Sequence, residues 1–332
     1  MQTRRTFLTT TGAAAILSAT ATIGLQPAVA EAMAVGQQRQ DLDPKGQAVT
    51  SPTLFAQTSK EKYAYRRFGK KGGIPLLLLQ HFIGTLDNWD PALTSALATE
   101  HDVILFDNAG IGKSSGSVPT TVAAMAQHAL AFLDALQIPS CDVLGFSLGG
   151  AVAQQMVLDR PTVFRKIILA GTSPRGGEDV MRLDKPSVGK YFQDPNLKGY
   201  QILQKIFFTP SAKSQAAGQA FIDRLMLRGA DRDPVSGPEI AQAQMAAFRE
   251  WDQPHGERFA ELKAIQQPTL VVNGVDDQLI AIKNSYALVE NLPDATLLVY
   301  PDSGHGAIFQ WHEAFARQAN LFLASKSESA AY

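Results

Sequence analysis

The sequence contains one cysteine and almost no excess charge, and these two scarcities exclude several classes of protein. Cys141 has no second cysteine to pair with, so no intrachain disulfide and no CxxC redox or zinc motif can form. The 30 lysine and arginine residues nearly balance the 31 aspartate and glutamate residues, so the basic surface of a nucleic-acid-binding protein is missing. The six histidines show neither HExxH nor HxH spacing, and we expect no metal site.

Long apolar runs are scarce as well. The run Gly12–Leu25 is short and rich in alanine and threonine, which does not predict a membrane anchor. It follows a twin-arginine pattern at Thr3–Leu8 (TRRTFL) and precedes a small-x-small cleavage signal at Ala28–Ala30. We therefore predict a twin-arginine signal peptide over residues 1–30, contact with the Tat translocase during export, and a periplasmic or secreted bacterial protein without stable membrane insertion after cleavage. Residues 31–50 are rich in Gln, Asp, Gly and Pro and predict a flexible linker.

Short apolar runs alternate with helical patterns from residue 52 onward. Each run is continuously apolar, as in strands that are covered on both faces. The runs are Leu76–Leu79, Val103–Phe106, Asp142–Phe146, Lys166–Ala170, Thr269–Asn273 and Thr296–Tyr300. This alternation predicts an α/β fold with a doubly wound, mostly parallel sheet.

Strand-like runs are missing between about residues 174 and 265. The interval holds helical patterns instead, at Tyr200–Phe208, Ser214–Arg228 and Pro238–Trp251. We predict a core formed by residues 51–173 and 263–327, with a helical cap inserted at residues 174–262.

Residues 145–149 (GFSLG) fit the pattern G-x-S-x-G. An apolar strand ends at Phe146 and a helical pattern begins at Gly149, which is the context of a nucleophile elbow. The glycines suit a turn that is too tight for side chains beside the serine, and the strain of that turn lifts the hydroxyl clear of the sheet. Ser147 is therefore the candidate nucleophile.

A serine hydroxyl is a poor nucleophile unless a base accepts its proton. His305 lies in the segment 302–306 (DSGHG), after the last predicted strand and before a helix, where a loop can bring the imidazole over the nucleophile. The base needs a carboxylate to orient it, and both Asp276 and Asp277 follow the strand Thr269–Asn273. Composition does not choose between these two acids.

With these residues the chain resembles the α/β-hydrolase superfamily over about residues 60–325. The resemblance is to the branch of capped esterases, lipases and cofactor-free haloperoxidases. It rests on the GFSLG elbow, the segment 107–114 (DNAGIGKS), the turn Gly274–Asp277 and the GHG sequence around His305. The family's acid commonly lies three residues after the glycine that closes the strand, which implies Asp277, with Asp276 as the alternative. The resemblance also implies that no cofactor is needed.

Acyl transfer needs hydrogen-bond donors for the oxyanion. The first candidate is the backbone N–H of Leu148. The family takes the second donor from the residue after a His-Gly pair, and here the matching segment is Gln80–Phe82, which implies the N–H of Phe82. This segment departs from the family pattern, and His81 either lines the pocket or packs in the core.

Three aromatic residues of the predicted cap, Phe207, Phe208 and Trp251, form an apolar substrate-binding wall or pack the cap onto the core. We predict hydrolysis of an ester or related acyl bond of a small, apolar substrate through an acyl-enzyme. The alternatives are perhydrolysis by the same triad and a ligand-binding protein with slow turnover. The sequence does not identify the substrate.

Overall fold

Residues 46–181 and 186–325 are described by the structure, which is a computed structural model of the chain. All of them belong to the unit Asp43–Tyr332. The predicted signal peptide and most of the predicted linker lie outside the described residues, so export and cleavage stay predictions.

The structure differs from the prediction at the end of the linker. Gln47–Thr50 forms the short helix α2, which packs against α3 (Pro91–Ala98). Ala48 and Val49 are buried there. Two apolar side chains thus have a place to pack, and helical structure is present before residue 51.

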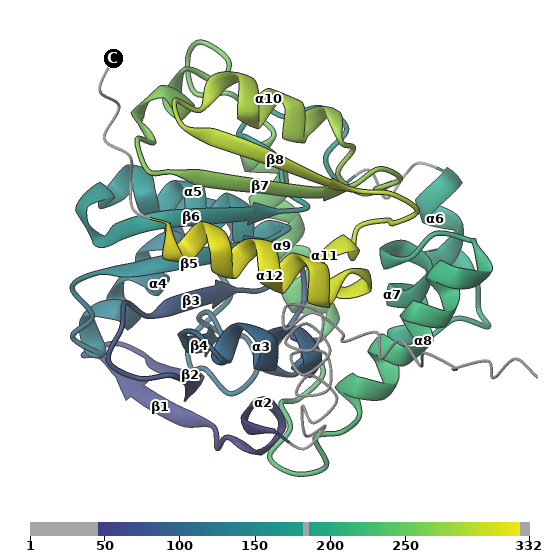
Figure 1. Cartoon of the computed structure of the whole chain (residues 1–332), viewed down its shortest axis with the longest axis horizontal. Helices are drawn as coiled ribbons and strands as arrows, with labels where there is room; N and C mark the ends of the chain where they lie inside the picture. The colour runs from purple at the N-terminus through teal and green to yellow at the C-terminus, as the bar shows by residue number, and fades with distance from the viewer. Residues whose placement is uncertain (1–45, 182–185, 326–332) are drawn as a thin grey trace, which may run out of the picture. The chain divides into compact units, whose positions relative to one another are not determined.

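An eight-stranded sheet forms the centre of this unit (Figure 1). The strands are β1 (Leu54–Gln57), β2 (Lys62–Gly69), β3 (Leu76–Leu79), β4 (Asp102–Phe106), β5 (Cys141–Phe146), β6 (Phe164–Ala170), β7 (Thr269–Gly274) and β8 (Ala295–Tyr300). Their order across the sheet is β1-β2-β4-β3-β5-β6-β7-β8. Only β2 runs antiparallel to its neighbours, and all other adjacent pairs are parallel. The predicted α/β fold with a mostly parallel sheet is confirmed.

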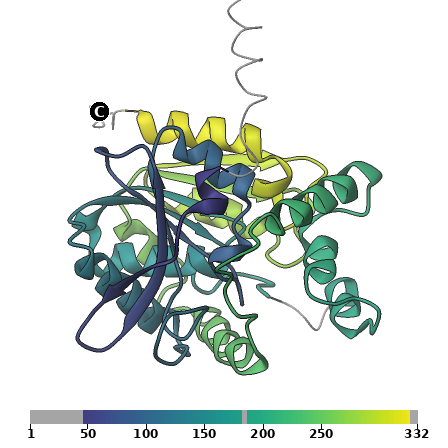
Figure 2. The same cartoon turned by 90° about the horizontal axis from the view of Figure 1, so that it is seen from below.

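Helices cover both faces of the sheet, as the continuously apolar strands require. The further helices are α4 (Val122–Ala135), α5 (Leu148–Asp159), α6 (Pro186–Gln193), α7 (Tyr200–Phe207), α8 (Ala212–Leu225), α9 (Pro238–Trp251), α10 (Lys283–Asn291), α11 (Ala307–Gln310) and α12 (His312–Ala324). Figure 2 shows α3 and α12 on one side of the sheet and α4 and α5 on the other. Every residue of β3, β4, β5 and β7 is buried between these layers. No helix within the described ranges is both long and apolar enough to cross a membrane.

The helical insertion between β6 and β7 divides into two parts. Helices α6, α7 and α8 lie beside the carboxyl ends of the strands (Figure 1). Arg224 of α8 forms an ion pair with Asp90, the N-cap residue of α3, with Nη2 at 2.6 Å from Oδ2, and this pair ties the insertion to the core. Helix α9 instead packs against α4 and so extends a core layer.

Candidate active site

Ser147 lies at a strained turn between β5 and α5. Its backbone has φ 57° and ψ −118°, a conformation that side-chain-bearing residues rarely adopt and that is typical of functional sites. The turn is tight. A Cβ atom on Gly145 would lie 2.3 Å from the carbonyl oxygen of Gly149, and one on Gly149 would lie 2.1 Å from the carbonyl oxygen of Leu79. The glycines of the G-x-S-x-G pattern are therefore required by close backbone approach.

The imidazole of His305 is hydrogen-bonded to Asp277. Its Nδ1 lies 2.8 Å from Oδ2 of that carboxylate, and both side chains are buried. The other oxygen of Asp277, Oδ1, accepts hydrogen bonds from the N–H groups of Leu279 and Ile280, each at 2.9 Å. Asp276, the alternative acid, is exposed. The structure thus brings Asp277 and not Asp276 to the histidine.

This contact determines which nitrogen of His305 can accept a proton. In the neutral ring Nδ1–H donates to the carboxylate, so Nε2 carries the lone pair. Nε2 is buried and has no hydrogen-bond partner among the described residues. His305 and Ser147 both line a cavity of about 610 Å³. No hydrogen bond joins the two side chains among the described residues, and such contacts commonly tighten only when substrate binds.

The loop that carries His305 is held by the insertion. The N–H of Gly306 donates to the carbonyl oxygen of Phe207 at 3.0 Å, and the N–H of His305 donates to that of Ile206 at 3.4 Å. These two hydrogen bonds hold the loop that carries His305 against the end of α7.

Of the two predicted oxyanion donors, Phe82 lines this cavity and Leu148 directly follows Ser147. Leu148 is the first residue of α5, so its N–H has no partner within the helix. The N–H groups of Leu148 and Phe82 take part in none of the hydrogen bonds found within residues 46–181 and 186–325. Helix α9 holds the loop after β3, because the N–H of Ile83 donates to Oε1 of Gln244 at 2.6 Å. The oxyanion roles of both residues stay predictions.

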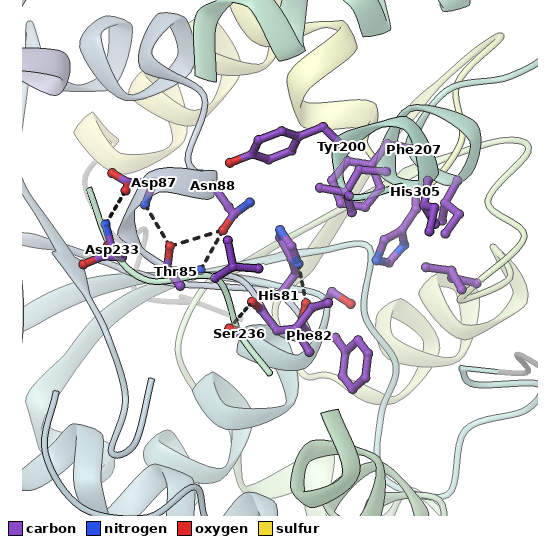
Figure 3. Close-up of a pocket in the computed structure, with 18 of the residues that line it drawn as sticks. His81, Phe82, Thr85, Asp87, Asn88, Tyr200, Phe207, Asp233, Ser236 and His305 are labelled. Atoms are coloured by element: carbon purple, nitrogen blue, oxygen red, sulfur yellow. Dashed lines mark hydrogen bonds between the residues drawn. The ribbon is translucent and has the colours of Figure 1, made fainter. Parts of the chain in front are cut away.

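Of the four remaining predicted residues, His81 and Phe207 line the cavity. Their rings meet edge to face, with centroids 5.4 Å apart (Figure 3). Both rings also contact Phe146, the residue before the nucleophile. The structure therefore places His81 beside the candidate catalytic residues.

Phe208 and Trp251 do not line this cavity, and the structure gives both of them the packing role that the sequence left as the alternative. Phe208 is buried against Phe221 of α8, with ring centroids 5.7 Å apart. Trp251 is the last residue of α9. The guanidinium carbon of Arg175 lies over the Trp251 ring, 4.2 Å from the ring centroid. Both are packing residues.

Sequence reasoning missed a polar end of the cavity, which includes Asp87, Asn88, Tyr200, Arg232 and Asp233 (Figure 3). Asp87 lies among cationic groups. Its Oδ1 is 2.8 Å from Nη1 of the buried Arg66, and its Oδ2 accepts the N–H of Asp233 at 2.7 Å. The dense charges at residues 228–233 (RGADRD) were the available signal for this feature.

Two carboxyl groups at this end lie close to one another. A Cβ on Gly112 would lie 2.1 Å from Oδ2 of Asp107 and 3.3 Å from Cγ of Asp233. Burial and the neighbouring Asp233 raise the pKa of Asp107 well above its usual range. Burial and Asp87 raise the pKa of Asp233 to about 6. The pair thus holds a proton more tightly than free carboxyl groups do. No group of three or more His, Cys, Asp or Glu side chains within the described chain is arranged to hold a metal ion.

Comparison with known proteins agrees with this fold. A family model described as alpha/beta hydrolase fold matches residues 74–310. The solved structure of an alpha/beta hydrolase fold protein from Chitinophaga pinensis is 40% identical, with a TM-score of 0.79, over 85% of this chain and 100% of that chain. A poly(3-hydroxyalkanoate) depolymerase of Ectopseudomonas oleovorans is 30% identical over 84% of this chain and 95% of its own length. A 2-hydroxy-6-oxo-6-phenylhexa-2,4-dienoate hydrolase of Burkholderia cepacia is 30% identical over 69% of this chain and 79% of its own length.

The chain belongs to the alpha/beta hydrolase fold family. The resemblance seen in the sequence is thereby confirmed. Several of its relatives are named as hydrolases, and the chain is an enzyme of this class.

Proposed function

We propose that the enzyme hydrolyses an ester or related acyl bond through a Ser147–His305–Asp277 triad and an acyl-enzyme. Ser147 attacks the carbonyl carbon while Nε2 of His305 accepts the hydroxyl proton. The same nitrogen then donates the proton to the leaving group, and water, deprotonated in turn by His305, releases the acyl group. The N–H groups of Phe82 and Leu148 stabilise the oxyanion.

One observation carries this proposal. The carboxylate of Asp277 holds Nδ1 of His305 at 2.8 Å, which leaves the lone pair of Nε2 unused in a cavity that Ser147 also lines. A histidine that only packs in a core needs neither a buried carboxylate nor a free nitrogen in a cavity, because buried polar atoms are normally paired.

The walls of the cavity support a small and largely apolar substrate. Its volume of about 610 Å³ suits a small molecule. Apolar side chains dominate the lining, among them Met181, Phe192, Ile202, Leu203, Ile206, Phe207 and Leu279. The relative named as a poly(3-hydroxyalkanoate) depolymerase and the one named as a dienoate hydrolase support hydrolysis of an acyl compound.

Mass spectrometry after treatment with a fluorophosphonate tests the nucleophile. We expect one adduct on Ser147 in the wild-type protein and none in Ser147→Ala, with hydrolysis of 4-nitrophenyl butyrate falling at least about 10³-fold in that variant. Ser285→Ala removes a buried hydroxyl of α10 that does not line the cavity, and it should keep the adduct. Folded wild-type protein that takes no label would contradict the proposal and favour a ligand-binding protein.

A further inference from the structure

His81 carries a hydrogen-bonding atom that the triad does not use. The residue lies two positions after the end of β3, its side chain lines the cavity, and only 5% of its surface is exposed. Its Nε2 is buried and has no hydrogen-bond partner among the described residues. Leaving such an atom unpaired destabilises a folded protein, so a cavity that keeps one is expected to pair it with a ligand.

The position of the proton on His81 follows from its neighbour. Nδ1 lies 2.8 Å from the carbonyl oxygen of Phe82, and the dashed line in Figure 3 marks this bond. A carbonyl oxygen only accepts, so Nδ1 must carry the hydrogen and Nε2 must carry the lone pair. Burial, partly offset by the bond to the Phe82 carbonyl, and the nearby His305 lower the pKa of His81 to about 4. At neutral pH the ring is uncharged, and Nε2 is an acceptor only.

The ring cannot easily turn away from this position. It meets Phe146 edge to face with centroids 5.5 Å apart, and it meets Phe207 in the same manner at 5.4 Å. The ring of His305 contacts the same two phenylalanines, at 5.0 and 5.6 Å. The acceptor is therefore held in the same part of the cavity as the candidate base.

These facts exclude two other roles for His81. An acceptor cannot stabilise an oxyanion, because that requires a donated hydrogen. A second general base would need a pKa closer to neutral pH and an orienting carboxylate, and among the described residues the ring's Nδ1 bonds to a carbonyl instead. An atom that only accepts can instead take a hydrogen bond from an O–H or N–H group of the bound substrate.

We propose that His81 determines specificity by accepting a hydrogen bond from a hydroxyl or N–H group on the acyl part of the substrate, close to the scissile carbonyl. The acyl part is chosen because the leaving group must lie at Nε2 of His305, which protonates it. Closeness to the carbonyl follows from the adjacent residue, Phe82, whose N–H is the candidate oxyanion donor. This inference rests on the proposed function. It assigns the enzyme to esters of hydroxyacyl or amino-substituted acyl groups.

The test compares matched esters. We expect kcat/KM for 4-nitrophenyl 2-hydroxybutyrate or 3-hydroxybutyrate to exceed that for 4-nitrophenyl butyrate by about tenfold or more, because binding the plain acyl group leaves Nε2 unpaired. His81→Phe keeps an aromatic ring and removes the acceptor. The ratio of kcat/KM for a hydroxy ester to kcat/KM for the butyrate ester should therefore fall close to one. His81→Gln supplies an acceptor oxygen and should restore part of the ratio. His255→Phe, at an exposed loop residue outside the cavity, should keep the wild-type ratio.

Two outcomes overturn the role of His81. One is a wild-type ratio near one for both hydroxy esters, as expected if cavity water satisfies Nε2. The other is an equal fall in kcat/KM for all three esters in His81→Phe, since a purely structural role would give no change of ratio. Fluorophosphonate labelling of the same samples separates the two proposals. If Ser147 is labelled but the hydroxy esters and the butyrate ester have similar kcat/KM, only the role of His81 is rejected. If folded protein takes no label, the proposed triad is rejected. His81→Gln provides the comparison if His81→Phe does not fold.

Discussion

Two adjacent aspartates follow β7, and their surroundings differ sharply. Asp277 is buried and receives hydrogen bonds from His305, Leu279 and Ile280. Asp276 is exposed, and only its backbone is held, by a bond from its N–H to the carbonyl oxygen of Ser303. Only one of the two carboxylates can therefore fix the tautomer of the histidine and stabilise its charged form.

Asparagine substitutions at these positions should separate them. We expect Asp277→Asn to lower kcat for 4-nitrophenyl butyrate by about 10³- to 10⁴-fold, because an amide favours the wrong tautomer of His305 and does not balance its positive charge. Asp276→Asn is the matched control and should stay within about twofold of the wild type. Steady-state kinetics on both variants decide the matter, and the reverse order of effects would refute the assignment.

The aromatic pair Phe207–Phe208 shows how one residue step changes a role. Phe207 is the last residue of α7 and contacts His81, Phe146 and His305. The chain becomes extended at Phe208, with φ −122°, and the ring of that residue packs on α8 instead. Sequence alone identified both as apolar, but it could not determine which one would face the cavity, because that depends on where α7 ends.

At the scale of elements, the site depends on the close packing of α5 against β3. Gly149, in the first turn of α5, lies against the carbonyl groups of Leu79 and Gln80. The same strand end leads into His81 and Phe82. Any movement of α5 away from β3 would therefore displace Ser147 and the oxyanion loop relative to each other.

Gly149→Ala should expose this dependence. Alanine favours helix over glycine, so an unconstrained site would gain stability. Here the added Cβ would lie 2.1 Å from a backbone oxygen, and we expect the free energy of unfolding to fall by about 1–3 kcal/mol and kcat/KM to fall more than about tenfold. Urea unfolding and ester kinetics measure the two effects. Gly73→Ala is the control, since nothing lies within 4 Å of its added Cβ, and equal behaviour of the two variants would refute this packing argument.

Helix α9 shows a limit of element prediction. The sequence predicts it as a helix, and the predicted cap at residues 174–262 includes it together with α7 and α8. The structure packs it on α4, where Gln244 holds the loop after β3. Periodicity identifies which face of a helix is apolar, but it does not identify the partner that covers that face.

At the scale of the whole molecule, the Asp107–Asp233 pair links stability to pH. Asp107 follows β4 in the core, whereas Asp233 belongs to the inserted segment that lines the cavity. Besides Asp107, the charged groups that act on Asp233 are Asp87 and Asp231, which raise its pKa, and Arg66 and Lys113, which lower it. Because folding raises the pKa of both acids, the folded state binds protons more tightly than the unfolded state. This contribution to stability is present below the ordinary carboxyl pKa of 3.8 and is lost as pH rises through about 6.

Asp233→Asn should remove much of the loss of stability that the wild type shows as pH rises. The amide keeps the shape and the backbone bond to Asp87, but it carries no charge at high pH. We expect its Tm to exceed that of the wild type by about 2–4 °C at pH 8 and by less at pH 5, measured by calorimetry. Asp134→Asn, at an exposed carboxylate of α4, should show no such dependence on pH. A difference in Tm that does not change between pH 5 and pH 8 would contradict the explanation by raised carboxyl pKa values.

The sequence by itself determined the parallel core and the candidate nucleophile and base. Continuous apolar runs require strands covered on both faces, and the glycines around Ser147 permit only one kind of turn. These properties depend on neighbouring residues, which a sequence displays directly. The signal peptide and export at residues 1–30 also come from sequence alone and stay predictions.

Only the tertiary structure decided which residues meet at the cavity. It brought together Asp277 and His305, which lie 28 residues apart, and separated Phe207 from Phe208 and Trp251. It also placed Asp87, Arg232 and Asp233 at one end of the cavity, and it left Nε2 of His81 without a partner among the described residues. Such contacts join segments that are distant in the chain, so they depend on how the elements pack and cannot be seen in the neighbouring residues of the sequence.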